Sequence, residues 1–272
     1  MRLFLTSRRW RLASGLVLFT YLVTHFTNHM LGLVSLEAAE SGLKLALFIW
    51  HSLPGTILLY GAALIHFALA LYTLYIRREW KLPPIEYLRL WAGFSLPLLL
   101  IGHATVTRLG ASLHAVTPTY AHTVASIIGG GSQEWQIALL APGWLHGCLG
   151  LWLSLRRYPL MRRLKPLLIG IVICVPLISA VGFMSMGREL VMRGVIAPRG
   201  AVAVVDDPYA APPQKGLGNS YSASAPSYDP VIASRAQELR TWKDRMINIY
   251  IALIIAALLI GPVRRTMFGA SG

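Results

Sequence analysis

Acidic residues are scarce in this chain, with 11 Asp and Glu against 25 Lys and Arg among 272 residues. Only 13% of the residues are charged whereas 55% are hydrophobic, a balance that excludes an ordinary soluble globular domain. In a soluble protein, the formal net charge of +14 would suggest nucleic-acid binding. Here the basic residues cluster instead at the ends of long apolar segments, as they do in membrane proteins. The sequence therefore predicts an integral membrane protein, with the lipid bilayer as a partner and no nucleic-acid ligand.

Cysteine is nearly absent, since only Cys148 and Cys174 occur and both lie within apolar segments. Two isolated cysteines exclude a disulfide framework and a thiolate metal cluster. The motif Cys-x-x-Cys-His is also missing, which excludes a covalently attached c-type haem. We interpret both cysteines as small buried apolar side chains.

Six apolar segments are long enough to cross a bilayer, for which a helix needs about 20 residues. Basic clusters lie at alternate ends of these segments, and the positive-inside rule assigns that side, with both chain ends, to the cytoplasm. The predicted fold class is all-α, an integral membrane bundle of six transmembrane helices. The predicted spans are residues 12–34, 54–76, 88–106, 137–155, 166–184 and 246–263.

The connections on the opposite side differ in composition. Residues 35–53 predict a short surface helix that begins at Ser35, with Trp50 and His51 at the membrane interface. Three glycines, residues 129–131, interrupt the connection between the third and fourth spans. We divide the chain into a helical bundle at residues 1–188, a long extracytoplasmic loop rich in Pro, Ser and Ala at 189–244, and a sixth span with its cytoplasmic exit at 245–272.

Five of the eight histidines fall within the predicted spans. Ionisable side chains inside a membrane are costly, so they mark functional sites by default. The first span carries two of them, and the second, third and fourth carry one each. These residues are His25, His29, His66, His103 and His146.

The depths of four histidines match in two pairs. At a rise of about 1.5 Å per residue, His25 and His103 each lie about 21 Å from the basic end of their helices. His66 and His146 lie about 16 and 15 Å from theirs. Facing histidines at one depth can ligate a haem iron from its two sides. The sequence therefore predicts two haem b groups, one on His25 and His103 and the other on His66 and His146.

His29 and Arg108 have several possible roles. His29 lies one helical turn from His25, so it could ligate in place of His25, line a quinone pocket or hydrogen-bond a haem propionate. A zinc or copper ion on His25 and His29 is a further alternative, although no third ligand lies close in sequence. Arg108 follows His103 by five residues and could pair with a propionate or extend to the membrane surface. Small residues near the histidines fit either a porphyrin or close helix packing.

Four motifs around these histidines resemble the dihaem cytochrome b membrane anchor of succinate dehydrogenases and fumarate reductases. The resemblance covers roughly residues 9–188 and implies four axial ligands from four helices, in the same two pairs that depth predicts. The anchor family normally ends after its fifth helix, whereas this chain adds a long loop and a sixth span. The motifs are His25-Phe-Thr-Asn28, Ile65-His66 followed by Leu71-Tyr72, His103-Ala-Thr-Val-Thr-Arg108, and His146 followed by Gly150-Leu-Trp152.

The extra span makes the chain similar to the N-terminal membrane module of redox-responsive bacterial class III adenylate cyclases. The motif Thr24-His25-Phe-Thr-Asn28-His29, followed by Gly32-Leu-Val-Ser-Leu-Glu37, carries this second resemblance. It implies a redox-sensing module in the bacterial inner membrane that accepts electrons, from quinol or another reductant, and controls a cytoplasmic cyclase domain. Any nucleotide chemistry then lies outside these 272 residues. Two alternatives remain: a quinone-reactive anchor subunit of a succinate dehydrogenase or fumarate reductase, and a haem-free transporter or structural membrane protein.

Overall fold

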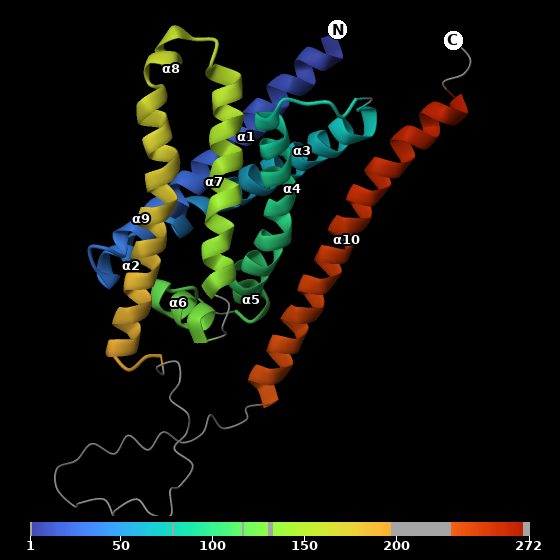
Figure 1. Cartoon of the computed structure of the whole chain (residues 1–272). Coiled ribbons are helices and arrows are strands. Elements are labelled where there is room, and N and C mark those ends of the chain that lie inside the picture. The colour runs from blue at the N-terminus through green and yellow to red at the C-terminus, as the bar shows by residue number, and fades with distance from the viewer. Residues whose placement is uncertain (1, 78, 116, 130–132, 197–229, 269–272) are drawn as a thin grey trace, which may run out of the picture.

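The computed structural model describes residues 2–77, 79–115, 117–129, 133–196 and 230–268. Within these ranges every regular element is a helix, so the predicted all-α fold class is confirmed (Figure 1). One element, η1, is a short π-helix. The elements are α1 (Arg2–Leu31), α2 (Leu36–Trp50), α3 (Leu53–Ile76), α4 (Pro84–Ala104), η1 (Thr105–Leu109), α5 (Gly110–Leu113), α6 (Tyr120–Gly129), α7 (Gln133–Leu155), α8 (Pro159–Arg163), α9 (Lys165–Met192) and α10 (Pro230–Phe268).

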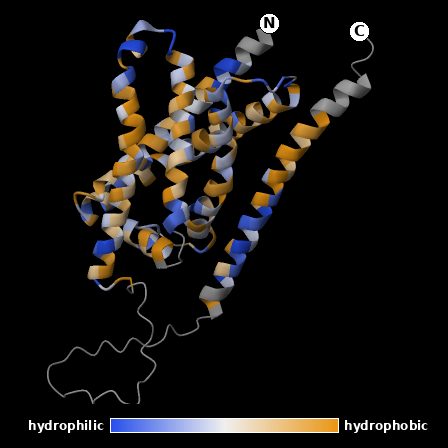
Figure 2. Cartoon of the chain, in the orientation of Figure 1, coloured by the Kyte–Doolittle hydropathy of each residue, from blue (hydrophilic) through white to orange (hydrophobic). Residues whose placement is uncertain are grey.

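Four helical stretches are long and apolar enough to cross a membrane: α3, the run Pro84–Leu113, α7 and α9. Their large apolar side chains point outward, as with Leu64 on α3 and Leu177 on α9, whose exposed fractions are 70% and 60%. Figure 2 shows apolar residues along these helices and hydrophilic residues near α8. Such a surface suits lipid, so the chain is a multi-pass membrane protein. The predicted first and sixth spans are helical, but His25, Asn28 and His29 lower the hydropathy of α1, and the six-span topology stays a prediction.

The ends of the helices divide between two sides of the bundle. The start of α1, the connection between α3 and α4, α8 and the end of α10 lie together at one end (Figure 1). Helices α2, α5 and α6 lie toward the opposite end. The basic clusters of the sequence thus gather at one end of the molecule, as expected from their alternation. Assignment of this end to the cytoplasm remains a prediction of the charge rule.

The predicted surface helix is confirmed as α2. Its N-cap is Ser35, whose hydroxyl oxygen accepts a hydrogen bond from the backbone N–H of Ala38 at 3.1 Å. A buried apolar cluster joins α2 to α6 and to the C-terminal part of α9, with Val124 and Leu190 at its centre. Helix α6 was not predicted, because its ten residues are too short to stand out as a separate apolar segment.

Helices extend into both ends of the predicted long loop at 189–244, and the division of the chain into three parts stays a prediction. Helix α9 continues past the predicted end of the fifth span to Met192, and α10 begins at Pro230. Proline is favoured in the first turn of a helix, and residues 231–245 are rich in Ala, Gln, Glu, Leu, Arg and Lys, which are good helix formers. This extension is polar, so hydropathy does not reveal it. Gly130, Gly131 and residues 197–229 lie outside the described residues.

Helices α1 and α9 touch through their backbones. A Cβ atom on Gly182 would lie 2.1 Å from the carbonyl oxygen of His29, and one on Gly32 would lie 2.8 Å from the carbonyl oxygen of Gly182. Small residues permit this close approach of membrane helices. The contact holds the histidine-bearing turn of α1 against α9. Helix α10 packs on the other side of the bundle, against α3, α4 and η1.

Candidate functional site

The five predicted histidines lie on helices α1, α3, α4 and α7. Within this group, α1 packs against α3, and α4 packs against α7. The ring centroids of His25 on α1 and His103 on α4 are 5.7 Å apart. Those of His66 on α3 and His146 on α7 are 6.0 Å apart. Each pair therefore bridges one packed helix pair to the other, and the two pairs are the ones predicted from depth.

The inner pair, His66 and His146, is held by hydrogen bonds from its Nδ1 atoms. Nδ1 of His146 donates to the backbone carbonyl oxygen of Arg89 at 3.0 Å. Nδ1 of His66 lies 3.2 Å from Oγ of Ser14. Because the Ser14 hydroxyl donates to the carbonyl oxygen of Trp10 at 2.7 Å, its oxygen accepts from His66. Both rings then carry the hydrogen on Nδ1 and keep a lone pair on Nε2.

The inner pair also packs tightly against neighbouring helices. A Cβ atom on Gly93 of α4 would lie 2.6 Å from Cε1 and Nδ1 of His146. One on Gly15 of α1 would lie 3.2 Å from Cε1 of His66. Each ring is therefore placed by a glycine on the next helix as well as by its hydrogen bond. Larger residues at either glycine would displace the ring.

In the outer pair, only His103 has a hydrogen-bond acceptor for Nδ1 like those of the inner pair. Nδ1 of His103 donates to Oε1 of Gln136, at the start of α7, over 2.6 Å. Nε2 of His103 is therefore left with a lone pair, as in the inner pair. His25 is placed differently, because its ring stacks on Tyr21 with centroids 5.8 Å apart and an interplanar angle of 15°.

His29 connects the outer pair to α6. Its Nδ1 atom is hydrogen-bonded to the hydroxyl of Tyr120 at 2.9 Å, and its Nε2 atom lies 3.3 Å from Nε2 of His25. The backbone N–H of Tyr120 donates in turn to a carboxylate oxygen of Glu40 on α2 over 2.7 Å. His29 is thus anchored by a residue that the sequence did not single out. A metal on Nε2 of His25 would replace the contact between the two histidines.

Arg108 lies in the π-helical turn η1, which directly follows the helix that carries His103. The hydroxyls of Thr105 and Thr107 donate to the carbonyl oxygens of Ile101 and His103, each over 2.7 Å. Such bonds compete with the backbone ladder, and π-helical turns of this kind are frequent at functional sites. The Arg108 guanidinium donates to Oγ1 of Thr56 at 3.3 Å, and no carboxylate in the described part of the chain pairs with it.

The charge on Arg108 also acts on His51, which lies in the connection before α3. Partial burial, together with the nearby Arg108 guanidinium, lowers the pKa of His51. The Arg108 guanidinium therefore lies close enough to His51 to disfavour a second positive charge there. An anionic group arriving here would find an unpaired guanidinium. His114 caps the C-terminus of α5 and His122 lies on α6, and neither belongs to either pair.

Comparisons with protein-family models, with curated proteins and with solved structures found no match for this chain.

The donor set fits a haem iron. Two imidazoles on opposite sides of one metal, each bonded through nitrogen at about 2 Å, place their ring centroids about 6 Å apart. Both pairs have this separation, and three of the four rings have Nδ1 engaged by an oxygen, as ligating histidines almost always do. Arg108 could pair with a propionate. The zinc or copper alternative lacks further ligands, since no group of three or more His, Cys, Asp or Glu in the described residues is placed to hold a metal ion.

Several residues of the site were not predicted from the sequence. Ser14, Tyr120 and Gln136 are polar residues in or near apolar segments, which is the only sequence signal that could have found them. The carbonyl oxygen of Arg89 gives no signal at all, because every residue has one. Gly93 could not be separated from other helix-packing glycines.

Proposed function

We propose that this chain is the membrane module of a redox-responsive protein, and that four histidines in it bind two haem b groups. The outer haem is held by His25 and His103, and the inner haem by His66 and His146. The observation that carries this proposal is the pairing of four histidines from four helices, with ring centroids 5.7 and 6.0 Å apart.

The surrounding residues orient the ligands. Ser14 and Arg89 hold Nδ1 of the inner histidines, and Gln136 holds Nδ1 of His103, so that Nε2 of these three rings would be free to ligate an iron. A bound haem b supplies one-electron oxidation and reduction at its iron. The apolar exterior of the bundle keeps both sites within the membrane, where a quinol is a suitable reductant.

Helix α10 contacts residues adjacent in sequence to the inner site and is our candidate for the output. The hydroxyl of Tyr250 donates to the carbonyl oxygen of Phe94 on α4 over 2.5 Å, and its ring lies 5.7 Å from that of Phe67 on α3. Phe67 follows His66, and Phe94 follows Gly93, which lies against His146. A small shift of either inner histidine would therefore move a direct neighbour of Tyr250.

Because α10 is a single unbroken helix, it is suited to transmit a structural change from the haem sites. It is one helix of 39 residues, and its end lies at the basic side of the molecule (Figure 1). We propose that it passes the redox state of the haems to a cytoplasmic domain, such as an adenylate cyclase. This helix favours the sensor over the alternative of a succinate dehydrogenase or fumarate reductase anchor, which has no need of it.

Replacing Tyr250 with phenylalanine is expected to weaken this coupling and to leave both haems bound. The change keeps the ring contact with Phe67 but removes the hydrogen bond to Phe94, worth about 0.5–1.5 kcal/mol. Hydrogen exchange of α10 amides, measured by mass spectrometry on the oxidised and reduced protein, should differ less between the two states than in the wild type. Tyr72→Phe is the control, because Tyr72 is exposed on α3. An undiminished difference in Tyr250→Phe would remove Tyr250 from the pathway.

The proposed function is tested by optical spectroscopy of the full chain purified in detergent. We expect a dithionite-reduced minus oxidised spectrum of b type, and a pyridine haemochrome assay that gives two haems per chain. The two sites differ in surroundings, so a potentiometric titration should resolve two midpoint potentials. Absence of a b-type signal after expression with sufficient haem supply would refute the proposal and leave a haem-free membrane protein.

A further inference from the structure

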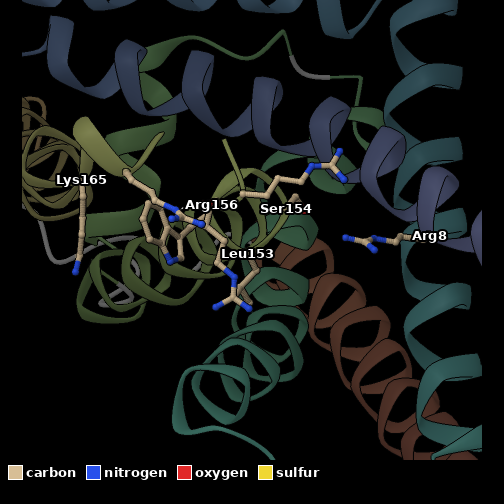
Figure 3. A pocket seen from close by; sticks show the side chains of 8 residues that line it. Arg8, Leu153, Ser154, Arg156 and Lys165 are labelled. Carbon is tan, nitrogen blue, oxygen red and sulfur yellow. Dashed lines mark hydrogen bonds between the residues drawn. The ribbon is translucent and has the colours of Figure 1, made fainter. Parts of the chain in front are cut away.

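A basic pocket lies at the end of the bundle where α7 meets α9, away from the histidines. It has a volume of about 680 Å³. Figure 3 shows Arg8 from α1 on one side of it, Lys165 from the start of α9 on the other, and Arg156 between them. The lining side chains come from α1, the end of α7, the following turn, α8 and α9. They are Arg8, Trp152, Leu153, Ser154, Arg156, Arg157, Arg162 and Lys165.

The pocket carries five positive charges and no negative one. Among the described residues, none of these five side chains forms an ion pair with a carboxylate. The arginines make other contacts: the Arg157 guanidinium donates to the Tyr158 hydroxyl at 3.0 Å, and that of Arg162 donates to the carbonyl oxygen of Arg156 at 3.1 Å. Like charges gathered around one cavity repel one another, so an anion would stabilise the arrangement.

The surroundings of the pocket indicate a lipid anion. It lies at the end of two helices that are long and apolar enough to span a membrane. Trp152 is a residue type enriched at membrane interfaces. Leu160 on α8 and Leu167 on α9 flank the pocket in sequence and are each 59% exposed, which leaves apolar surface beside the charged groups. A headgroup phosphate and the acyl chains attached to it would contact these two kinds of surface together.

We propose that this pocket binds the headgroup of an anionic phospholipid, with a preference for a headgroup that carries two phosphates. Arginine forks form paired hydrogen bonds with phosphate oxygens. Cations on both sides of the cavity suit two phosphates better than one. This site is independent of the haem groups, since it shares no residue with either histidine pair. Its loss would leave the haem spectrum unchanged.

The test measures lipid binding to the full chain by native mass spectrometry, with cardiolipin as the two-phosphate lipid and phosphatidylcholine as the neutral reference. The variant is the double change Arg8→Gln and Arg162→Gln. Its matched control is Arg9→Gln with Arg163→Gln, which removes the same charge from α1 and α8 at positions outside the pocket. Melting temperatures without added lipid show whether each variant is folded.

We expect the wild type to bind cardiolipin at least tenfold more tightly than phosphatidylcholine. Each basic residue near an anionic headgroup contributes about a fivefold gain, so the pocket variant should bind about 25-fold more weakly and the control less than twofold. An equal loss in the control would overturn the pocket as a specific site. Inorganic pyrophosphate is the soluble probe, and binding of pyrophosphate as tight as that of cardiolipin would overturn the assignment to a lipid.

Discussion

Replacing His66 with alanine is expected to lower the haem content of the purified chain from two groups to one. His66 is the α3 member of the inner pair, and its ring centroid lies 6.0 Å from that of His146. A haem iron bonded to one imidazole instead of two loses half of its protein ligands, so the inner haem should dissociate during purification. The pyridine haemochrome assay measures the number of haems per chain, and circular dichroism checks that the protein remains helical.

The control variant for this prediction is His29→Ala. His29 also lies in the interior, but it is hydrogen-bonded to Tyr120, and its neighbour His25 is the residue that faces His103. We therefore expect His29→Ala to retain two haems and His25→Ala to retain one. Two haems in His66→Ala would contradict the inner site. One haem in His29→Ala together with two in His25→Ala would show that His29, and not His25, ligates the outer haem.

Replacing Gly182 with alanine is expected to destabilise the bundle, although alanine is the better helix former. The added Cβ would lie 2.1 Å from the carbonyl oxygen of His29 and 3.3 Å from Cα of Met30, so the backbones of α1 and α9 must separate. Overpacking of this kind costs typically about 1–3 kcal/mol. The melting temperature in detergent should fall, and the outer haem should be affected more than the inner one because His25 and His29 lie on the displaced turn.

Gly170→Ala is the control on the same helix. A Cβ atom at Gly170 would meet no atom within 4 Å, so only the difference in helix propensity acts there. That difference favours alanine by about 0.5–1 kcal/mol in a helix interior. The melting temperature of Gly170→Ala should therefore stay level or rise. A similar fall in both variants would show that helix propensity, not the contact between α1 and α9, governs the result.

The pairing of the histidines can be predicted from their positions along the predicted helices. Helices have a fixed rise, and the basic residues mark one end of each span, so the depths of His25, His66, His103 and His146 could be calculated without coordinates. The structure brings together the same two pairs. The alternation of basic clusters likewise predicted which helix ends share a side.

The long connection was predicted less well, because its helical extensions are polar. Residues 230–245 lack the apolar run that marks a span, so hydropathy does not distinguish the start of α10 from the loop. The π-helical turn at Thr105–Leu109 was missed for a related reason. It arises from threonine hydroxyls that bond to carbonyl oxygens, a local competition that apolar periodicity does not register.

The sequence by itself determined the membrane class, the apolar segments and the depths of the paired histidines, because hydropathy and helical rise are local properties of the chain. Only the tertiary structure decided how the histidines are held. The acceptors for Nδ1 are Ser14 of α1, the carbonyl oxygen of Arg89, and Gln136 of α7, which lie 52, 57 and 33 residues from the histidines they bind. The contact of Tyr250 with α4 and the charged pocket between α1, α7 and α9 have the same origin. Such partners meet only when helices distant in sequence pack together, and no local pattern records which helices those are.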